Sequence, residues 1–228
     1  MEKAVAKWAG GYGNLRGGVA GEGLRDLTGF PTGVWLLGSE RVRKDVKEGR
    51  FWPLLKDWLK RQCLVCASTP GEGDRPRNEY DATHARRETS ADNHGLIPGH
   101  AYTILHCVEV GGNMLLNIRN PWGAFEWNGD WGDSSLLWSD RVKREISEQT
   151  GMSVDDVVRD DDGCFWMSYF DWIKFFASVS VCEIVSAEGI EWCAAREKVS
   201  PNTCVNKAGG EREAKKQVAR PPFVHTDS

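Results

Sequence analysis

Two strand-like runs joined by a short glycine turn place the strongest constraint on how this chain can fold. Residues 101–110 and 114–119 are rich in apolar and β-branched residues, and Gly111-Gly112-Asn113 separates them. This pattern predicts a β-hairpin. His100 precedes the first strand and Asn120 follows the second, and the proline after Asn120 removes a backbone donor, so the pairing should end there.

Helices are expected around this hairpin. Apolar residues at i, i+3, i+4 and i+7 predict an amphipathic helix over residues 51–62, and Ser139 is placed to cap a charged helix that ends near Thr150. A capping-box pattern at residues 168–171 begins a third helix. Strands mixed with helices indicate an α+β fold. Shorter strands are expected at residues 63–67 and 179–184.

Three segments lack the regular spacing of apolar residues that is typical of a helix or a strand. Residues 68–94 are rich in Pro, Gly and charge, which predicts a mobile surface loop that is either a gate over a cleft or an insertion without a role. Residues 122–138 form a Trp- and Gly-rich loop, and packing of an irregular loop is favoured over a surface that stacks sugars or bases. Residues 186–228 are expected to be a disordered tail or linker, which leaves 1–185 as the folded domain.

Charge and cysteine usage exclude several classes of protein. The formal net charge of -4 argues against a nucleic-acid binder that works by phosphate neutralisation. No apolar run approaches the length of a membrane span, and no secretory signal follows Met1. The seven cysteines are therefore expected to be reduced thiols in a cytoplasmic protein. The Cys63-Leu-Val-Cys66 spacing favours a buried strand over a metal or redox site, because no second ligand pair completes it.

His100 and Asn120 are the candidate catalytic pair. A histidine that follows Gly99 at the mouth of a strand can present its ring to a cleft, and the side-chain oxygen of Asn120 can accept the imidazole N–H and fix the tautomer. Trp122 is placed to cover this hydrogen bond and keep water away from it. The pair would form the base and its orienting partner in a Cys-His-Asn triad, in which a thiolate attacks a peptide carbonyl.

The register of the hairpin decides whether these two side chains can meet. A hairpin centred on Val110 places His100 opposite Asn120, whereas one centred on Gly112 places His100 opposite residue 124. The sequence leaves the register open, so contact requires either the first register or a bulge. The alternative is that the histidine and the asparagine only serve turns at the base of the hairpin.

Seven short motifs carry a resemblance to a known family. They are Glu2-Lys-Ala-Val-Ala-Lys7, Gly17-Gly-Val-Ala-Gly-Glu-Gly23, Asp26-Leu-Thr-Gly29, Gly99-His-Ala-Tyr102, Ile118-Arg-Asn-Pro-Trp-Gly123, Glu126-Trp127 and Phe165-Trp-Met-Ser168. Their order and spacing make residues 2–185 resemble the second half of the catalytic core of calpain-type proteases, which are papain-like.

The resemblance implies both a fold and an activity. The expected fold is the C-terminal papain-like subdomain, with twisted antiparallel β-strands flanked by helices. His100 would be the catalytic base and Asn120 its orienting partner, with Trp122 and Gly99 in the active-site wall. The resemblance also implies an intracellular, calcium-activated endopeptidase that cleaves protein substrates at limited sites.

One part of the family pattern has no match in this sequence. The nucleophilic cysteine of the family, and the glutamine that helps to hold the oxyanion, belong to a preceding subdomain. None of the seven cysteines lies in the matching context at a helix N-terminus. The chain alone is therefore expected to be inactive until it meets that N-terminal Cys-bearing subdomain. Two alternatives stay open: a pseudoprotease that serves as a protein-interaction module, and a structural Trp-rich binding protein.

The resemblance further implies a Ca²⁺ site. Its ligands would be the carboxylates of Glu126, Asp133 and Asp162, together with a main-chain oxygen of Asp160, and oxygen ligands suit this hard cation. Cys164 stands where the family usually has a last acidic ligand, which should weaken the site. The alternative is a solvated acidic turn. His84 and His94 are expected to be solvated rather than to bind a metal.

Overall fold

The computed structural model describes residues 2–15, 17–71, 94–159 and 162–184. They belong to one unit, Met1–Glu191. Most of the predicted polar loop, including His84, and all of the predicted tail lie outside the described residues. The helices and strands are α1 (Glu2–Trp8), η1 (Tyr12–Leu15), α2 (Ala20–Thr28), β1 (Thr32–Leu36), α3 (Glu40–Lys47), α4 (Phe51–Lys60), β2 (Leu64–Ser68), β3 (Ala101–Val110), β4 (Asn113–Arg119), α6 (Asp140–Thr150), η2 (Val154–Asp156), β5 (Cys164–Ser168), α7 (Tyr169–Phe175) and β6 (Ser178–Cys182).

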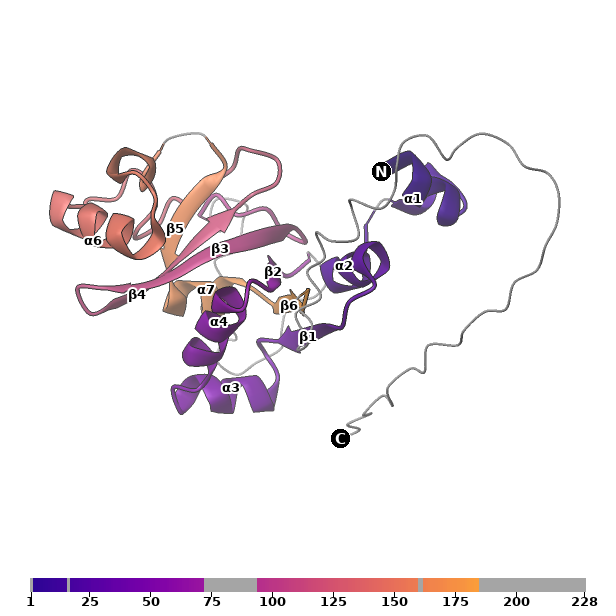
Figure 1. Cartoon of the computed structure of the whole chain (residues 1–228), viewed down its shortest axis with the longest axis horizontal. Coiled ribbons are helices and arrows are strands. Elements are labelled where there is room, and N and C mark those ends of the chain that lie inside the picture. The colour runs from indigo at the N-terminus through magenta and orange to yellow at the C-terminus, as the bar shows by residue number, and fades with distance from the viewer. Residues whose placement is uncertain (1, 16, 72–93, 160–161, 185–228) are drawn as a thin grey trace, which may run out of the picture. The chain divides into compact units, whose positions relative to one another are not determined.

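Six antiparallel strands form one sheet in the order β1-β6-β2-β3-β4-β5 (Figure 1). The long β3–β4 hairpin lies between β2 and β5, and β6 returns between β1 and β2. The sheet and the helices that flank it confirm the predicted α+β fold. None of the described helices is long and apolar enough to cross a membrane.

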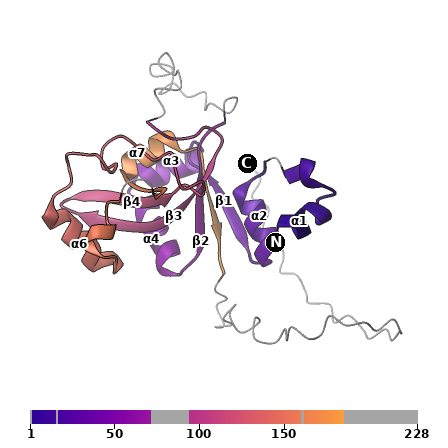
Figure 2. The same cartoon turned by 90° about the horizontal axis from the view of Figure 1, so that it is seen from above.

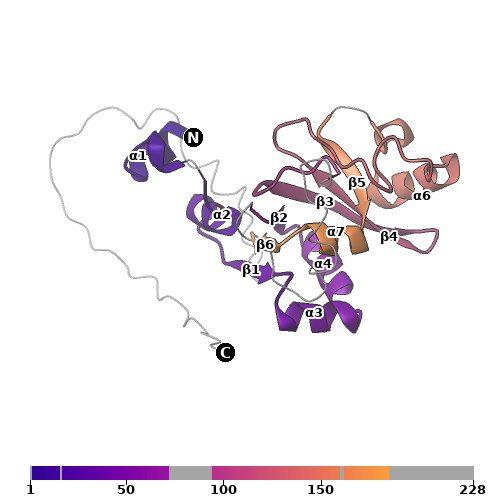
Figure 3. The ribbon, with the colours of Figure 1, turned by 180° about the vertical axis from the view of Figure 1, so that it is seen from behind.

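Alternation along the central strands supplies two hydrophobic clusters. Leu116 of β4 packs in the larger cluster with Phe51 of α4 and Trp172 of α7. Its neighbour Leu115 packs in a smaller cluster with Ile146 of α6. Successive side chains of a strand point to opposite faces of a sheet, so α4 and α7 cover one face and α6 the other (Figure 3). All five side chains are fully buried.

Several elements match their predictions closely. The hairpin strands are Ala101–Val110 and Asn113–Arg119, and the helix predicted at 51–62 is Phe51–Lys60. Ser139 caps α6 and Ser168 caps α7, each by accepting the N–H of the third residue along. The strand predicted at 63–67 is Leu64–Ser68, although Leu64 itself is partly exposed.

Several elements were not expected from the sequence: the strands β1 and β5, the helices α1, α2 and α3, and the short 3₁₀ helices η1 and η2. The helix α2 lies in the glycine-rich segment 17–29, and it packs against β1 and β6 (Figure 2). A Cβ at Gly21 of α2 would lie only 3.0 Å from Val34 Cγ2 of β1, so the missing side chain lets helix and strand approach. Gly21 therefore serves packing within a regular element.

The register of the hairpin changes partway along its length. From Val110 opposite Asn113 to His106 opposite Asn117 the pairing is regular, and a bulge at Leu105 then shifts it by one residue, which places Thr103 opposite Arg119. Three residues further along each strand this ladder would place position 100 opposite position 122. Neither register considered from the sequence is present, because the hairpin is centred between Gly111 and Gly112. The bulge that the sequence leaves open is present at Leu105.

Candidate active site

The end of β2 holds His100 in position. The backbone N–H of His100 donates to Oγ1 of Thr69 at 2.9 Å, and the N–H of Thr69 donates to the carbonyl of His100 at 3.0 Å. Gly99 has a φ of 62°, in the left-handed region that favours glycine, and its N–H donates to the carbonyl of Pro70 at 2.9 Å. These contacts fix the backbone from which the imidazole projects.

The predicted hydrogen bond between His100 and Asn120 is present. Nε2 of His100 lies 2.8 Å from Oδ1 of Asn120, and the asparagine is fully buried. The two residues are not directly opposite each other in the ladder. They meet because β4 ends at Arg119 and the chain turns at Asn120, with the N–H of Gly123 donating to the Asn120 carbonyl at 3.0 Å.

Contacts to the rest of the Asn120 amide fix its orientation. Nδ2 donates to the carbonyl oxygens of Ala124 and Phe125, and Oδ1 also accepts the backbone N–H of Trp122 at 3.1 Å. An amide oxygen only accepts hydrogen bonds, so Nε2 of His100 must carry the proton that it shares with Oδ1. In the neutral imidazole Nδ1 is then the basic nitrogen.

Aromatic rings line two sides of the imidazole. The ring of Trp122 lies 4.4 Å from that of His100, and Tyr102 lies edge-on at 5.0 Å. Tyr102 is buried, and its hydroxyl accepts the N–H of Ile97 at 2.8 Å. Trp122 thus contacts the imidazole as expected, but its side of the site is open because the tryptophan is 63% exposed.

Tyr102 is a neighbour of the site that the sequence interpretation missed. It lies two residues beyond His100, so the alternation of a strand places both side chains on the same face. Burial raises the pKa of the Tyr102 hydroxyl, while its hydrogen bond with the backbone of Ile97 opposes the shift. The phenol is therefore neutral and acts as a packing wall for the imidazole.

None of the described thiols is arranged as a nucleophile. Burial raises the pKa of Cys63, Cys66 and Cys107, and it raises the pKa of Cys164 to about 11. Among the described residues no thiol forms a hydrogen bond with His100. The reactive species is the thiolate, so thiols that keep their protons at neutral pH are poor nucleophiles. The described cysteines are Cys63, Cys66, Cys107, Cys164 and Cys182, all without disulfide bonds.

Two of the predicted calcium ligands lie on either side of one loop. Oε1 of Glu126 accepts the N–H of Gly163 at 2.6 Å, and Oδ1 of Asp162 accepts the N–H of Cys164 at 2.7 Å. After burial, the negative charge of Asp162 is the next largest cause of the raised Cys164 pKa, and Glu126 adds to it. This loop also contacts the turn over residues 120–123, which is called the catalytic turn below because it carries the candidate residue Asn120. The Gly163 carbonyl accepts the Asn120 N–H at 2.7 Å.

Of the other predicted ligands, Asp133 has buried side-chain oxygens, and Asp160 lies outside the described residues. Within the part of the chain that the structure describes, no three His, Cys, Asp or Glu side chains gather closely enough to hold a metal ion. The calcium site therefore stays a prediction.

Comparison with known proteins agrees with this geometry. The sequence profile of the calpain family of cysteine proteases matches residues 1–183. The calpain-type cysteine protease DEK1 of Arabidopsis thaliana is 34% identical over 189 residues, which cover 82% of this chain and 8% of that protein. Calpain clp-4 of Caenorhabditis elegans is 36% identical over 191 residues, 82% of this chain and 23% of the relative. Calpain-9 of Mus musculus is 34% identical over 188 residues, which cover 81% of this chain and 24% of the relative. The chain thus spans less than a quarter of the length of these relatives.

Proposed function

The chain belongs to the calpain family of cysteine proteases, and we propose that it provides the histidine half of the active site of a cysteine-type endopeptidase. The observation that carries this proposal is the 2.8 Å hydrogen bond between His100 Nε2 and Asn120 Oδ1. It leaves Nδ1 of His100 as the free base on the open side of the site. The substrates are proteins, as expected of a protease.

In the proposed mechanism His100 takes up and returns one proton in each of two half-reactions. Nδ1 takes the proton of a cysteine thiol, the thiolate attacks the peptide carbonyl, and the imidazolium returns the proton to the leaving amine as the C–N bond breaks. Water then attacks the thioester with His100 again as base, which releases the acid and restores the thiol. Asn120 holds the ring through both steps, and the buried hydrogen bond keeps Nε2 protonated.

The nucleophile in this proposal comes from a Cys-bearing subdomain and not from the described cysteines. Two observations support this part: the raised pKa values of four described thiols (Cys63, Cys66, Cys107 and Cys164), and the lack of any described thiol bonded to His100. An arrangement that keeps the base and its orienting amide intact favours an enzyme over a pseudoprotease. A pseudoprotease has no need of a fixed tautomer.

A chimera tests the proposal directly. Residues 2–184 would replace the matching segment of mouse calpain-9, and peptide cleavage would be measured for this chimera and for three variants of it. His100→Ala should lower kcat/KM by about 10²- to 10⁴-fold. Asn120→Ala should lower it less, and Glu148→Gln on the exposed side of α6 is the matched control. A folded, active chimera that His100→Ala leaves unchanged would rule out the proposed role of His100.

Calcium dependence is a separable part of the proposal. Glu126 and Asp162 support it, since two carboxylates flank the loop that contacts the catalytic turn. If bound there, Ca²⁺ would neutralise these charges and hold the loop. Calorimetry with Ca²⁺ on the calcium-free chain should detect weak binding, and Cys164→Glu should tighten it because a carboxylate replaces a soft ligand. Absence of heat from both proteins would remove calcium from the proposal.

A further inference from the structure

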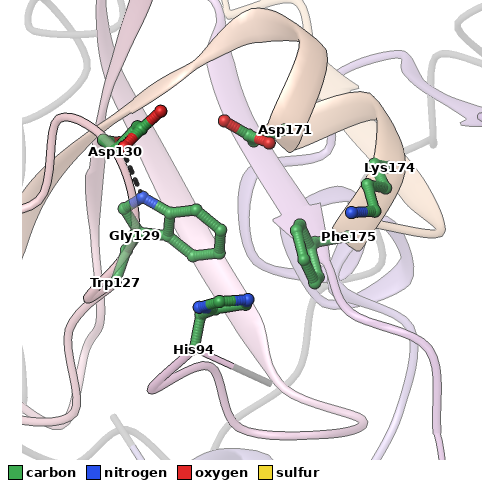
Figure 4. Close-up of a pocket in the computed structure, with 7 residues that line it drawn as sticks. All are labelled: His94, Trp127, Gly129, Asp130, Asp171, Lys174 and Phe175. Carbon is green, nitrogen blue, oxygen red and sulfur yellow. Dashed lines mark hydrogen bonds between the residues drawn. The ribbon is translucent and has the colours of Figure 1, made fainter. Parts of the chain in front are cut away.

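A cavity lies between the loop that follows residues 120–123 and the helix α7. Its volume is about 260 Å³, and it is lined by His94, by three residues of the loop (Trp127, Gly129 and Asp130) and by one side of α7. Figure 4 shows the indole ring of Trp127 between several groups. Two carboxylates lie on one side of it, and the phenyl ring of Phe175 and the imidazole of His94 lie on its other sides. None of these residues belongs to the pair that holds the catalytic proton.

Three aromatic rings give this cavity rigid walls. The rings of Trp127 and Phe175 lie 5.0 Å apart, and His94 lies 5.0 Å from Trp127 and 5.5 Å from Phe175. Trp127 is buried, and its Nε1–H donates to the carbonyl of Asp130 at 2.8 Å. A Cβ on Gly129 would lie 2.2 Å from the indole, so the loop accommodates the ring only because residue 129 is glycine.

The backbone around His94 is also fixed. His94 has a φ of 47°, unusual for a residue with a side chain, and its carbonyl accepts the N–H of Asn128 at 2.9 Å. A Cβ on the next residue, Gly95, would lie 2.0 Å from the carbonyl oxygen of Glu126. The histidine was expected to be solvated, but although exposed, its ring packs against the two aromatic side chains.

The charges at the rim favour a positively charged ligand. The side chains of Asp130 and Asp171 lie at the same edge of the cavity (Figure 4). Neither forms an ion pair with a described residue, and Ser168 Oγ donates a hydrogen bond to Oδ2 of Asp171 at 2.7 Å. Three residues after Asp171 on the same helix, Nζ of Lys174 lies 4.8 Å from the centre of the Phe175 ring. The wall therefore already accepts an ammonium group from the chain itself.

We propose that this cavity binds a guanidinium or ammonium group carried on an alkyl chain. Aromatic faces attract such cations through the ring quadrupole, and carboxylates within reach add direct charge attraction. The aliphatic stem would lie along the rings, as the stems of basic side chains do on apolar surfaces. Lys174 competes weakly for the same wall. The inference stands on its own and does not depend on protease activity.

Small cations of matched shape test the proposal on the full chain. The probes are N-acetyl-arginine amide and N-acetyl-lysine amide, with N-acetyl-citrulline amide as the uncharged analogue of the first. The readout is the assigned indole N–H signal of Trp127 in NMR titrations. Saturable shifts at millimolar concentrations with either cation, and none with citrulline, are expected. Equal shifts with citrulline would overturn the proposal.

Two substitutions with opposite expected effects complete the test. Asp130→Asn removes one attracting charge but keeps the carbonyl that holds Trp127, so it should weaken binding by about two- to fivefold. Lys174→Met removes the competing cation and should tighten binding by a similar factor. Glu148→Gln on α6 is the control and should change nothing. Unchanged affinity in both Asp130→Asn and Lys174→Met would overturn the proposal.

Discussion

Asn120 shows how much of a catalytic arrangement one buried amide can determine. Its oxygen bonds His100 and its nitrogen donates to two backbone carbonyls, so the amide can be placed in only one of its two flipped orientations. This orientation also fixes the tautomer of the imidazole, because the proton on Nε2 leaves Nδ1 as the basic nitrogen. The tautomer of the histidine therefore depends on hydrogen bonds of Asn120 in which the imidazole takes no part.

Asn120→Ala is predicted to release the tautomer of His100. Without the acceptor the Nε2–H loses its buried partner, so the fraction of the other tautomer should rise. Long-range ¹H–¹⁵N NMR spectra report the protonation of each ring nitrogen. His106 of β3, which forms none of these bonds, is the internal control. An unchanged His100 pattern in the folded variant would show that Asn120 does not fix the tautomer.

Cys107 should make stability depend on alkaline pH. Burial raises the pKa of this thiol above its ordinary value of 9.0, and the charge of Lys56 opposes the shift. Since the folded pKa exceeds the unfolded one, this contribution to stability is full below about pH 9 and is lost as the pH rises further. Urea unfolding at about pH 8 and about pH 10 should therefore show a larger loss for the wild type than for Cys107→Ala. Equal losses would contradict the assignment.

At the scale of elements, the catalytic turn and the loop before β5 form one unit. The carbonyl of Gly163 accepts the N–H of Asn120, and Glu126 accepts the N–H of Gly163. A Cβ on Gly163 would lie 2.6 Å from the Cα of Gly123. The close approach of two backbones thus holds the asparagine end of the site.

Gly163→Ala is predicted to separate these two backbones. The φ of 82° adds strain to the steric overlap, so the change should lower the free energy of unfolding by about 2 to 4 kcal/mol. Gly151→Ala is the matched control: its φ is 75°, but nothing lies within 4 Å of the added Cβ. Its loss should be about 1 kcal/mol. Similar losses in chemical denaturation would mean that the contact with Gly123 matters little.

Local signals explain which elements the sequence predicts. The hairpin has a glycine turn between regular strands, and Ser139 and Ser168 mark their helices because a hydroxyl there accepts a free N–H. The helix α3, with the sequence ERVRKDVK, has only two apolar residues, so its sequence shows little amphipathic period although Ser39 caps it in the same way. The strand β5 has consecutive buried residues that show no alternation. Such segments take their structure from the neighbours that they pack against.

The sequence predicts which residues form the candidate site, but it does not predict the backbone geometry that brings them together. His100 and Asn120 follow from residue type and from their positions at the hairpin ends, and their contact is confirmed. The bulge at Leu105 and the turn after Arg119 that bring them together leave no period in the sequence. Asp160, the predicted main-chain ligand of calcium, lies outside the described residues.

At the scale of the whole molecule, the exposed side of the site is apolar. Trp122 is 63% exposed and Phe125 is 62% exposed, with their rings 6.4 Å apart. Large apolar side chains that remain exposed next to each other are typical of a surface that meets another part of a protein. This arrangement agrees with a nucleophile that arrives from a separate subdomain.

The isolated chain is accordingly predicted to have no peptidase activity. Casein and an unstructured fluorogenic peptide would be incubated with the purified chain, with and without Ca²⁺. No turnover above buffer is expected, because a base without a thiolate lacks the covalent route. Turnover that Cys66→Ser abolishes would instead identify a nucleophile within the chain.

The residue that follows Asn120 also protects the site against chemical ageing. Deamidation of asparagine begins when the next backbone nitrogen attacks the side-chain carbonyl to give a succinimide, and Pro121 has no N–H with which to complete that ring closure. The carboxamide that orients the imidazole is thus spared a slow conversion to a carboxylate. Asn128 precedes Gly129, which lines the cavity described above. Because glycine has a backbone N–H, Asn128 lacks the protection that Pro121 gives to Asn120.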